Sequence, residues 1–393
     1  MQARPLTLHI RLTKACNADC SYCSSWQESP ERRLSPDSLT KILDFVLDTG
    51  PSALGINPTH LTAQFIGGEI AMVPSAELDQ HIAVIKDACA KRSISYVFGA
   101  QSNLIVSDRR AAVLYDQFEG RLGTSIDLTS NTRTIKGDAD RYRLIWKSAD
   151  NYLMKNRSVP GAVYVLEPDG YSDAEKHLMD SARVGRMLTL RPIFEGGIKS
   201  VQLNSARQFR ESMERLFDRW FLKLPIIVEP FYQLCESRVS EVSGSSRLVS
   251  TACAFQNDCT TKSLNIDPNG DLHVCLEMAD AGLTPIGNGL QGTWDDQSIA
   301  MFSSRSQHLN ATCKACPYLN SCQGGCMYES IAQGQGVHGK SFHCETWKSL
   351  FRRIDEAISE HGAEHVHDWL HRLATRHENA KHNGLARAAL AHE

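Results

Sequence analysis

The chain has 393 residues, of which 42 are Lys or Arg and 45 are Asp or Glu, so its formal net charge is −3. This balance excludes the strong basic field that favours nucleic-acid binding, and it gives no acidic excess typical of disorder. The length suits one barrel of roughly 200 to 250 residues plus a second unit. Neither a signal peptide nor an apolar run of about 18 residues is present, so we expect a cytoplasmic protein that does not enter a membrane.

Three closely spaced cysteines follow the first predicted strand, which covers residues 6–12. Cys16, Cys20 and Cys23 have the spacing C-x3-C-x2-C. Thiolates ligate iron–sulfur clusters, and because a [4Fe-4S] cube takes four of them, three cysteines leave one iron open to a substrate or cofactor. A zinc site is the alternative, but structural zinc takes four ligands, normally in paired C-x2-C units. The spacing therefore favours a cluster.

Strands and helices alternate along the first half of the chain. Apolar periodicity predicts six strands, at residues 6–12, 61–66, 94–98, 122–126, 162–166 and 187–193. The helices predicted between them cover residues 35–49, 76–90, 108–118, 140–154 and 173–182. This alternation predicts an α/β fold of parallel β-α units, an open or partial (β/α)6 barrel. Four polar segments follow strands, at 16–23, 67–69, 101–103 and 125–127, and the carboxyl ends of parallel strands meet at one edge.

A second group of eight cysteines lies farther along the chain: Cys253, Cys259, Cys275, Cys313, Cys316, Cys322, Cys326 and Cys344. Eight thiolates equal two complete [4Fe-4S] sites. A pair of zinc ribbons is the competing interpretation, since C-x2-C units also bind zinc. A tight turn at 267–271, between predicted strands at 264–266 and 272–274, would bring Cys259 and Cys275 to one end of a hairpin. The remaining cysteines, Cys89 and Cys235, are predicted to be packing thiols.

The first loop resembles that of the radical S-adenosylmethionine (SAM) superfamily, whose C-x3-C-x-(aromatic)-C pattern is matched by Cys16, Cys20, Tyr22 and Cys23. The resemblance implies that the open iron chelates SAM and that reductive cleavage gives a 5′-deoxyadenosyl radical, which abstracts hydrogen from a substrate. The later cysteines are similar to the SPASM extension of these enzymes, through Cys259-x10-Gly270-x4-Cys275, then C-x2-C-x5-C-x3-C, then Cys344. The resemblance covers the chain from about residue 6 to about residue 344.

The resemblance implies three [4Fe-4S] clusters, one that binds SAM and two auxiliary ones. Relatives pair the cysteines so that auxiliary cluster I would take Cys253, Cys259, Cys275 and Cys326. Auxiliary cluster II would take Cys313, Cys316, Cys322 and Cys344. Since full ligation leaves no open iron, we expect both auxiliary clusters to relay an electron away from an oxidised substrate radical.

The resemblance also implies a SAM site at the strand ends. The residues implied to bind SAM are Gly67, Gly68, Glu69, Asn103, Ser125, Asp127 and Arg133. A carboxylate such as Glu69 suits the SAM ammonium, because it accepts hydrogen bonds and compensates charge. Arg133 would meet the SAM carboxylate, with Arg141 or Arg143 as alternatives, and an arginine at a solvated helix start is the competing interpretation.

Enzymes with this extension mostly modify peptides or proteins, and our first prediction is a cross-link on a ribosomally made peptide, with net loss of two hydrogens. The alternative is formylglycine formation, as in the anaerobic sulfatase-maturating enzymes. These place an Asp base directly after the residue matching Cys275, whereas here Leu276 stands there and Glu277 follows. Glu277 is thus a tentative base, although a surface acid is the preferred interpretation. A non-enzymatic electron-transfer or scaffold protein is the third hypothesis, which the open cluster site disfavours.

These features predict four segments: a barrel at 1–200, a bridging helix (206–221) and linker at 201–247, a SPASM domain at 248–350 and a polar helical tail at 351–393. A last helix is predicted at 347–359. The end of the chain from residue 361 holds seven of the fifteen histidines at irregular spacing, which predicts a solvated helix rather than a metal site. Expected partners are a peptide or protein substrate, an electron donor such as flavodoxin or ferredoxin, and a separate peptide-recognition protein, because no such domain precedes the first strand.

Overall fold

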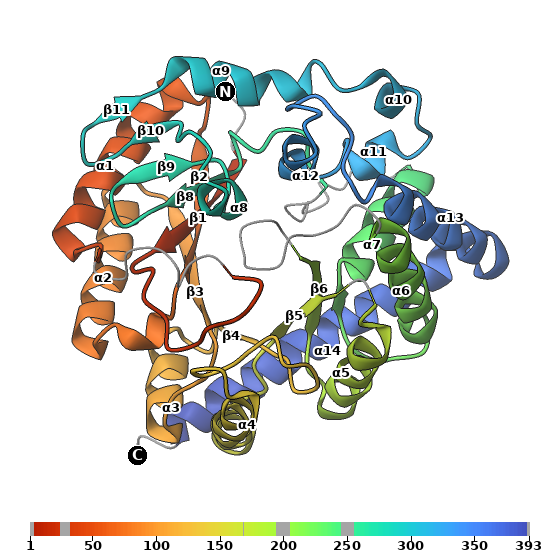
Figure 1. Cartoon of the computed structure of the whole chain (residues 1–393), viewed down its shortest axis with the longest axis horizontal. Helices are drawn as coiled ribbons and strands as arrows, with labels where there is room; N and C mark the ends of the chain where they lie inside the picture. Colours follow the sequence, from red (N-terminus) through yellow and green to blue (C-terminus); the bar gives the residue numbers. More distant parts are fainter. Residues whose placement is uncertain (1–3, 24–31, 168, 194–204, 245–254, 391–393) are drawn as a thin grey trace.

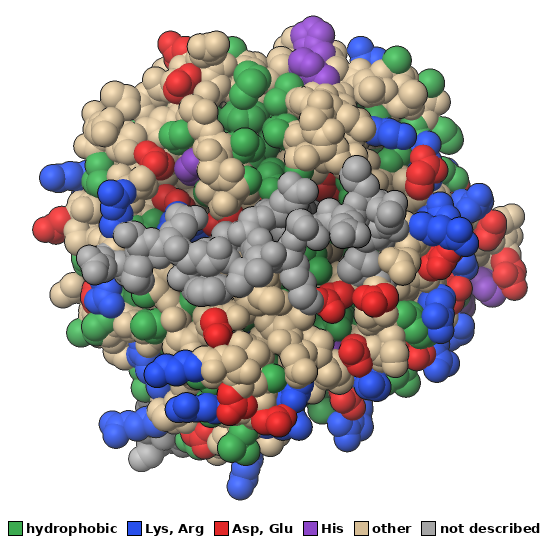
Figure 2. Space-filling view, viewed as in Figure 1, with side chains coloured by type: hydrophobic (Ala, Val, Ile, Leu, Met, Phe, Trp, Pro, Cys, Tyr) green, Lys and Arg blue, Asp and Glu red, His purple; other side chains and the backbone are tan. Residues whose placement is uncertain are grey.

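The computed structural model describes residues 4–23, 32–167, 169–193, 205–244 and 255–390. Within these residues the strands form one sheet of eleven, in the order β11-β10-β9-β8-β1-β2-β3-β4-β5-β6-β7, with helices around it (Figure 1). Acidic and basic side chains are interspersed over the face drawn in Figure 2, in keeping with the small net charge.

The first half of the chain forms the predicted partial (β/α)6 barrel. Its parallel strands are β1 Arg4–Arg11, β2 Pro58–Ile66, β3 Ser95–Ser102, β4 Leu122–Ser125, β5 Ala162–Leu166 and β6 Leu188–Pro192. Its helices are α1 Pro36–Ala53, α2 Ser75–Lys91, α3 Asp108–Gln117, α4 Ala139–Asn156, α5 Tyr171–Val184 and α6 Ser205–Trp220. A further parallel strand, β7 Val228–Glu229, pairs with β6. Its two residues are too few to give a sequence pattern.

Local sequence explains where the barrel helices begin. The side chain of Ser35 accepts a hydrogen bond from the Ser38 amide at the start of α1, and Pro36 stands at the first helical position. Ser107 and Asp138 cap α3 and α4 in the same way.

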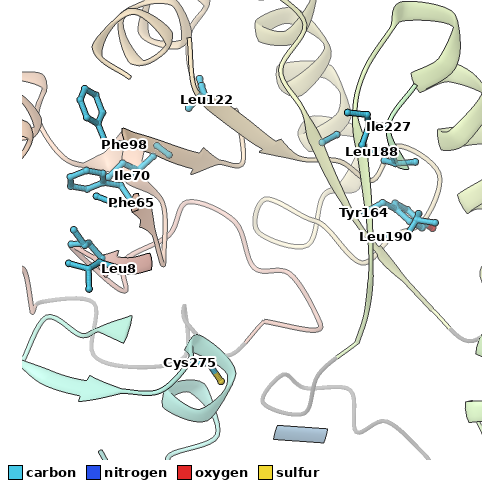
Figure 3. Close-up of a cluster of buried hydrophobic side chains, with 14 of the residues drawn as sticks. Leu8, Phe65, Ile70, Phe98, Leu122, Tyr164, Leu188, Leu190, Ile227 and Cys275 are labelled. Atoms are coloured by element: carbon cyan, nitrogen blue, oxygen red, sulfur yellow. The ribbon is translucent and has the colours of Figure 1, made fainter. Parts of the chain in front are cut away.

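Alternation along the strands separates a core face from an inner face. Leu6, Leu8 and Ile10 of β1 are buried in the hydrophobic core, so His9 lies on the opposite face of the sheet. In Figure 3, Leu8, Phe65 and Phe98 gather beside the first strands, while Leu188 belongs to a group beside β5 and β6. The inner face is therefore free for polar side chains.

The cysteine-rich region continues the barrel sheet. Strand β8 Ser263–Ile266 pairs in parallel with β1, and β9 Asp271–His273 returns antiparallel as the predicted hairpin. Strands β10 Gly287–Asn288 and β11 Thr293–Trp294 complete this edge. The buried Arg11 of β1 donates to Asp280 at 2.6 Å and lies 3.4 Å from Asp267. The predicted barrel and SPASM segments thus share one sheet and one ion-pair network.

Five short helices follow: α8 Leu276–Asp280, α9 Asp296–Ser303, α10 Ala311–Lys314, α11 Leu319–Cys322 and α12 Met327–Ala332. Two of the later cysteines lie in them, Cys313 in α10 and Cys322 in α11. The 3-10 turns are η2 Ile70–Met72 and η3 Ser304–Ser306. Three longer helices, α7 Phe231–Val242, α13 Cys344–His361 and α14 Ala363–Leu390, close the structure beside α6. Because α13 begins at Cys344, the predicted division at residue 350 falls inside a helix.

The prediction of a solvated C-terminal tail is wrong for one face of α14. Val366, Leu370 and Leu373 are buried, and the Trp369 ring lies 4.8 Å from that of Trp220. The helix also contacts α7 and α4, so it spans several barrel helices (Figure 1). Among the residues that the structure describes, no helix combines the length and hydropathy needed to cross a membrane.

Candidate metal centres

The first cysteine loop runs beside the segment that follows β4. The amide of Asp19 donates to the Thr134 carbonyl at 3.1 Å, and the amide of Ser21 donates to the Thr132 carbonyl at 2.9 Å. The Asp19 carboxylate also accepts from the Thr134 hydroxyl at 2.7 Å. Backbone pairing over more than 100 positions of sequence therefore fixes the loop against the rest of the barrel mouth.

The three thiol groups of this loop form one electrostatic cluster. Burial, with smaller contributions from Glu69, Cys20 and Cys23, raises the pKa of Cys16 to about 12. The Cys16 sulfur accepts from the Ala18 amide at 3.4 Å and lies 3.6 Å from the Asn103 Nδ2 donor. These donors suit a thiolate ligand, whose negative charge a bound metal centre would compensate. The donor set therefore fits an iron–sulfur cluster.

Single-ion sites have a different geometry. Within the described ranges, no three His, Cys, Asp or Glu side chains converge on a position for one metal ion. A [4Fe-4S] cube is ligated at separate irons, so its cysteines need not converge on one point.

Gly67 and Gly68 allow the cysteine loop to approach the end of β2. The Gly68 amide donates to the Thr13 carbonyl at 3.0 Å, and a Cβ on Gly68 would lie 2.1 Å from the Ala15 carbonyl oxygen. Gly67 has a φ of +109°, and a Cβ there would lie 2.2 Å from the Arg11 side chain. Only glycine fits at both positions. The close approach of the cysteine loop therefore explains the two glycines better than a simple turn at the end of the strand does.

Glu69 joins the ends of β2 and β3. Its carboxylate is buried and accepts from the Ala71 amide at 2.9 Å, the Ser102 hydroxyl at 2.7 Å and the Asn103 amide at 2.7 Å. Burial raises the pKa of Glu69, although these donors oppose the shift. The Asn103 side chain in turn donates to Asn17 at 2.8 Å. The structure thus gathers the predicted Gly67, Gly68, Glu69 and Asn103 beside the cysteines, while their contact with SAM stays a prediction.

Asp127 orders its own loop. Although burial opposes ionisation, the nearby His177 ring, 3.9 Å away, and hydrogen bonds from the Ser130 and Thr132 hydroxyls hold the pKa of Asp127 well below its usual range. The carboxylate also accepts from the Ser130 amide at 3.0 Å. Ser125, also predicted to bind SAM, accepts from Gln101 at 3.3 Å. Asp127 therefore positions the residues that lead to Arg133.

Arg133 is the buried arginine among the three candidates. Its side chain lies over the Tyr22 ring at 5.4 Å, and the residue is 7% exposed. Burial raises the pKa of the Cys20 thiol, and Arg133 opposes that shift. The buried Arg133 Nε has no hydrogen-bond partner among the described residues. A cation with an unused donor beside the cysteine loop suits an anionic ligand, and the interpretation as a solvated helix start is wrong.

The two alternative arginines lie elsewhere. Arg143 is engaged by Asp140 at 2.6 Å and by the Ser130 carbonyl at 2.7 Å. Arg141 is exposed on α4.

Glu277 lies inside the protein, not on its surface as the preferred interpretation expected. The side chain is 14% exposed and accepts a hydrogen bond from Arg191 at the end of β6. Although burial opposes ionisation, Arg191 and His9 lower the pKa of Glu277. The buried Nδ1 of His9 has no hydrogen-bond partner among the described residues. The sequence analysis did not single out His9 or Arg191. Each follows an apolar residue within a predicted strand, and this alternation of apolar and polar residues could have placed both on the inner face of the sheet.

Four cysteines of the second group line one cavity: Cys313, Cys316, Cys322 and Cys344. They are the four that the resemblance assigns to auxiliary cluster II. Burial raises the pKa of Cys322 to about 12, with Cys344 adding to the shift. Four cysteines around one cavity fit a metal cluster better than four unrelated packing thiols.

The other predicted auxiliary group is partly described. Cys259 and Cys326 both interact electrostatically with the buried Arg305. Cys275 directly precedes α8, which carries Glu277. Cys253 lies outside the described residues. Cys89 and Cys235 are both buried, as expected for packing thiols.

The fold is that of radical SAM enzymes with a SPASM-type cysteine-rich domain. One similar solved structure is the anaerobic sulfatase maturase anSMEcpe with bound AdoMet and Kp18Cys peptide, with 16% identity, a TM-score of 0.67, and coverage of 91% of this chain and 100% of that chain. Another is Streptococcus suis SuiB bound to precursor peptide SuiA, with 16% identity, a TM-score of 0.53, and coverage of 86% and 74%. No protein-family model matches the sequence, and no curated protein matches it either. At this identity the likeness shows the fold.

Proposed function

We propose that this chain is a radical SAM enzyme that modifies a peptide or protein. The observation that carries the proposal is the packing of the Cys16, Cys20 and Cys23 loop on Gly68, beside the buried cation of Arg133. SAM bound at such a cluster supplies a carbon radical able to abstract hydrogen. The solved anSMEcpe and SuiB structures with bound peptides support a peptide substrate.

The residues around the loop have separate proposed roles. Cys16, Cys20 and Cys23 hold the SAM-binding cluster. Arg133 binds the SAM carboxylate with its unused donor, and Gly67, Gly68, Glu69, Asn103 and Ser125 shape the remaining contacts. Asp127 contributes by fixing the loop that carries Arg133. The eight later cysteines hold two auxiliary clusters, and a flavodoxin or ferredoxin supplies electrons.

Our first candidate reaction is a cross-link within a ribosomally made peptide, with a net loss of two hydrogens. One hydrogen leaves as an atom to the SAM-derived radical. The other leaves as a proton, which the proposed base Glu277 accepts, and an electron, which the auxiliary clusters accept. Peptide binding would use the barrel surface or a separate recognition protein.

The second candidate reaction is oxidation of Ser or Cys to formylglycine, which the location of Glu277 favours. An ionised carboxylate inside the protein, beside His9 and Arg191, is suited to accept the proton that a substrate radical loses. A carboxylate on the protein surface would not be suited to this role. Glu277 thus serves as proposed base in either reaction.

The test is the intact mass of substrates co-expressed anaerobically with this protein: a short peptide encoded beside its gene and, separately, a sulfatase. A cross-link is supported if the peptide becomes lighter by two hydrogens, resists protease and reductant, and does not react with a hydrazide probe. An aldehyde captured by the hydrazide supports formylglycine. If loaded protein forms no 5′-deoxyadenosine from SAM and dithionite, the chain is an electron-transfer or scaffold protein and the proposal fails.

A further inference from the structure

Arg305 is a fully buried arginine in η3, with 0% of its surface exposed. Its Nη1 donates to the carbonyls of Val337 and Gly339, the second at 3.0 Å. Its Nη2 donates to the carbonyls of Gly324 and Gly325, at 2.9 and 3.2 Å. All four acceptors are uncharged, so these bonds hold the guanidinium in place without neutralising its charge.

The glycine carbonyls belong to the segment that joins the two proposed auxiliary clusters. Gly324 and Gly325 have φ values of +89° and +71°, a conformation that favours glycine, and they separate Cys322 from Cys326. The resemblance assigns Cys322 to cluster II and Cys326 to cluster I. By binding both carbonyls, Arg305 fixes the path between one ligand of each cluster.

Arg305 binds the backbone between Cys322 and Cys326, and its charge interacts with thiols of both groups. Burial lowers the pKa of Arg305, whereas the thiolates of Cys259, Cys326, Cys313 and Cys322 raise it. Two of these cysteines belong to each proposed cluster. Among the described residues no carboxylate forms an ion pair with Arg305, and its buried Nε has no hydrogen-bond partner. A buried cation is costly unless nearby negative charge compensates it, and thiolate-ligated clusters would supply that charge.

We propose that Arg305 is a positioning residue shared by the two auxiliary clusters, which it holds at a fixed relation and whose reduced forms it stabilises by its charge. The inference rests on the proposed function, because it needs both clusters to be present. Adding an electron makes a cluster more negative, so a fixed cation nearby favours the reduced form. Loss of the cation therefore lowers both reduction potentials.

The experiment uses the full chain with Cys16, Cys20 and Cys23 replaced by Ala, so that only auxiliary clusters remain. Iron is counted per chain, and midpoint potentials are measured by redox titration monitored by electron paramagnetic resonance. Arg305→Met removes the charge, and Arg305→Lys keeps it. Arg157→Met is the matched control, because Arg157 is a buried arginine that pairs with Asp116 at 2.7 Å.

Fewer than eight irons in the parent refutes the auxiliary clusters themselves, before Arg305 is tested. If Arg305→Met keeps eight irons, we expect both clusters to become at least tenfold harder to reduce, which is 59 mV for one electron. Unchanged potentials, or a change in one cluster only, overturn the proposal. If Arg305→Met loses iron, the outcome for Arg305→Lys distinguishes the two explanations. Eight irons in Arg305→Lys support the role of the charge, and fewer than eight overturn the proposal. The control should match the parent.

Discussion

Arg191 donates a hydrogen bond to the carboxylate of Glu277, which joins the end of barrel strand β6 to helix α8 of the cysteine-rich region. The pair places a charged residue of each region on the inner side of the shared sheet. Because Cys275 immediately precedes α8, the contact also ties the proposed base to a proposed ligand of auxiliary cluster I.

Replacing Glu277 separates SAM cleavage from substrate oxidation. In Glu277→Gln we expect modified product to fall by about 10²-fold or more, because the proton acceptor is lost. Formation of 5′-deoxyadenosine should continue, since the cysteine loop is untouched. Chromatography of the nucleoside and mass spectrometry of the peptide measure the two quantities. Equal loss of both would show that Glu277 acts on the SAM site instead.

Replacing Arg191 should move the pH dependence. Arg191 lowers the pKa of Glu277, so Arg191→Met lets that pKa rise toward or above its ordinary value. A base with a higher pKa is protonated at higher pH, and the acid limb of the rate profile should shift upward. Arg183→Met, at an exposed arginine of α5, is the control and should leave the limb in place. An unshifted limb in Arg191→Met would remove Glu277 as the base.

Arg133 should dominate SAM affinity. In Arg133→Met we expect the Kd for SAM to rise by about 10- to 100-fold, because hydrogen bonds between charged groups contribute about 1.5 to 3 kcal/mol. Anaerobic titration calorimetry on the loaded protein measures it. Arg143→Met is the matched control, since Arg143 is already engaged by Asp140 and the Ser130 carbonyl. A larger effect in the control would return the role to Arg143.

Gly68→Ala should prevent loading of the SAM-binding cluster. The added Cβ would lie 2.1 Å from the Ala15 carbonyl oxygen, so the cysteine loop must move. Iron should fall from about twelve per chain to about eight, the content of two auxiliary cubes. In Gly161→Ala the nearest atoms would be 3.9 Å from the new Cβ, so full loading is expected. Twelve irons in Gly68→Ala would contradict this account.

The barrel could be predicted from sequence because its signals are local. The strand at 162–166 and the start of the helix at 108 follow from apolar periodicity, and the structure confirms both. The cysteine spacings are equally local. Figure 1 shows the resulting order of elements around the sheet.

Long-range relationships could not be predicted in this way. Thr7 pairs with Ser263, which joins the barrel and the cysteine-rich region in one sheet. Neither strand has a sequence pattern that indicates this pairing. The four carbonyls bound by Arg305 lie 19 to 34 positions away, and carbonyls have no sequence identity to recognise. Glu277 was expected on the surface because no partner for a buried carboxylate stands near it in the sequence. Its partner, Arg191, lies 86 positions earlier.

Glu229 should make stability fall with rising pH. Burial raises the pKa of Glu229 to about 7, from an ordinary 4.5, so the folded protein favours the protonated carboxyl. This stabilisation is full below pH 4.5 and is lost as pH rises through about 7. Glu229→Gln should therefore gain up to about 3 kcal/mol over wild type at pH 8, and little at pH 4.5. Urea unfolding at both values tests this, with the exposed Glu119→Gln as a surface control that should change stability by no more than about 0.5 kcal/mol.

Trp369 should fix α14 to the barrel helices. The side chain is 8% exposed, and its ring lies 4.8 Å from that of Trp220 and 5.4 Å from that of Phe221. In Trp369→Ala the lost contacts and the cavity should cost about 3 to 5 kcal/mol of the free energy of unfolding. Denaturant unfolding of the cluster-loaded protein measures this cost.

The control for Trp369 stands on the same helix. His367 has a half-exposed side chain, so His367→Ala should change stability by no more than about 0.5 kcal/mol. A neutral Trp369→Ala, or a His367→Ala that is equally damaging, would mean that α14 is not held by its buried face. The predicted difference in stability between the two variants requires that α14, although mostly polar and rich in histidine, has one apolar face. Val366, Leu370 and Leu373 are buried and stand at helical spacing, so they form that face.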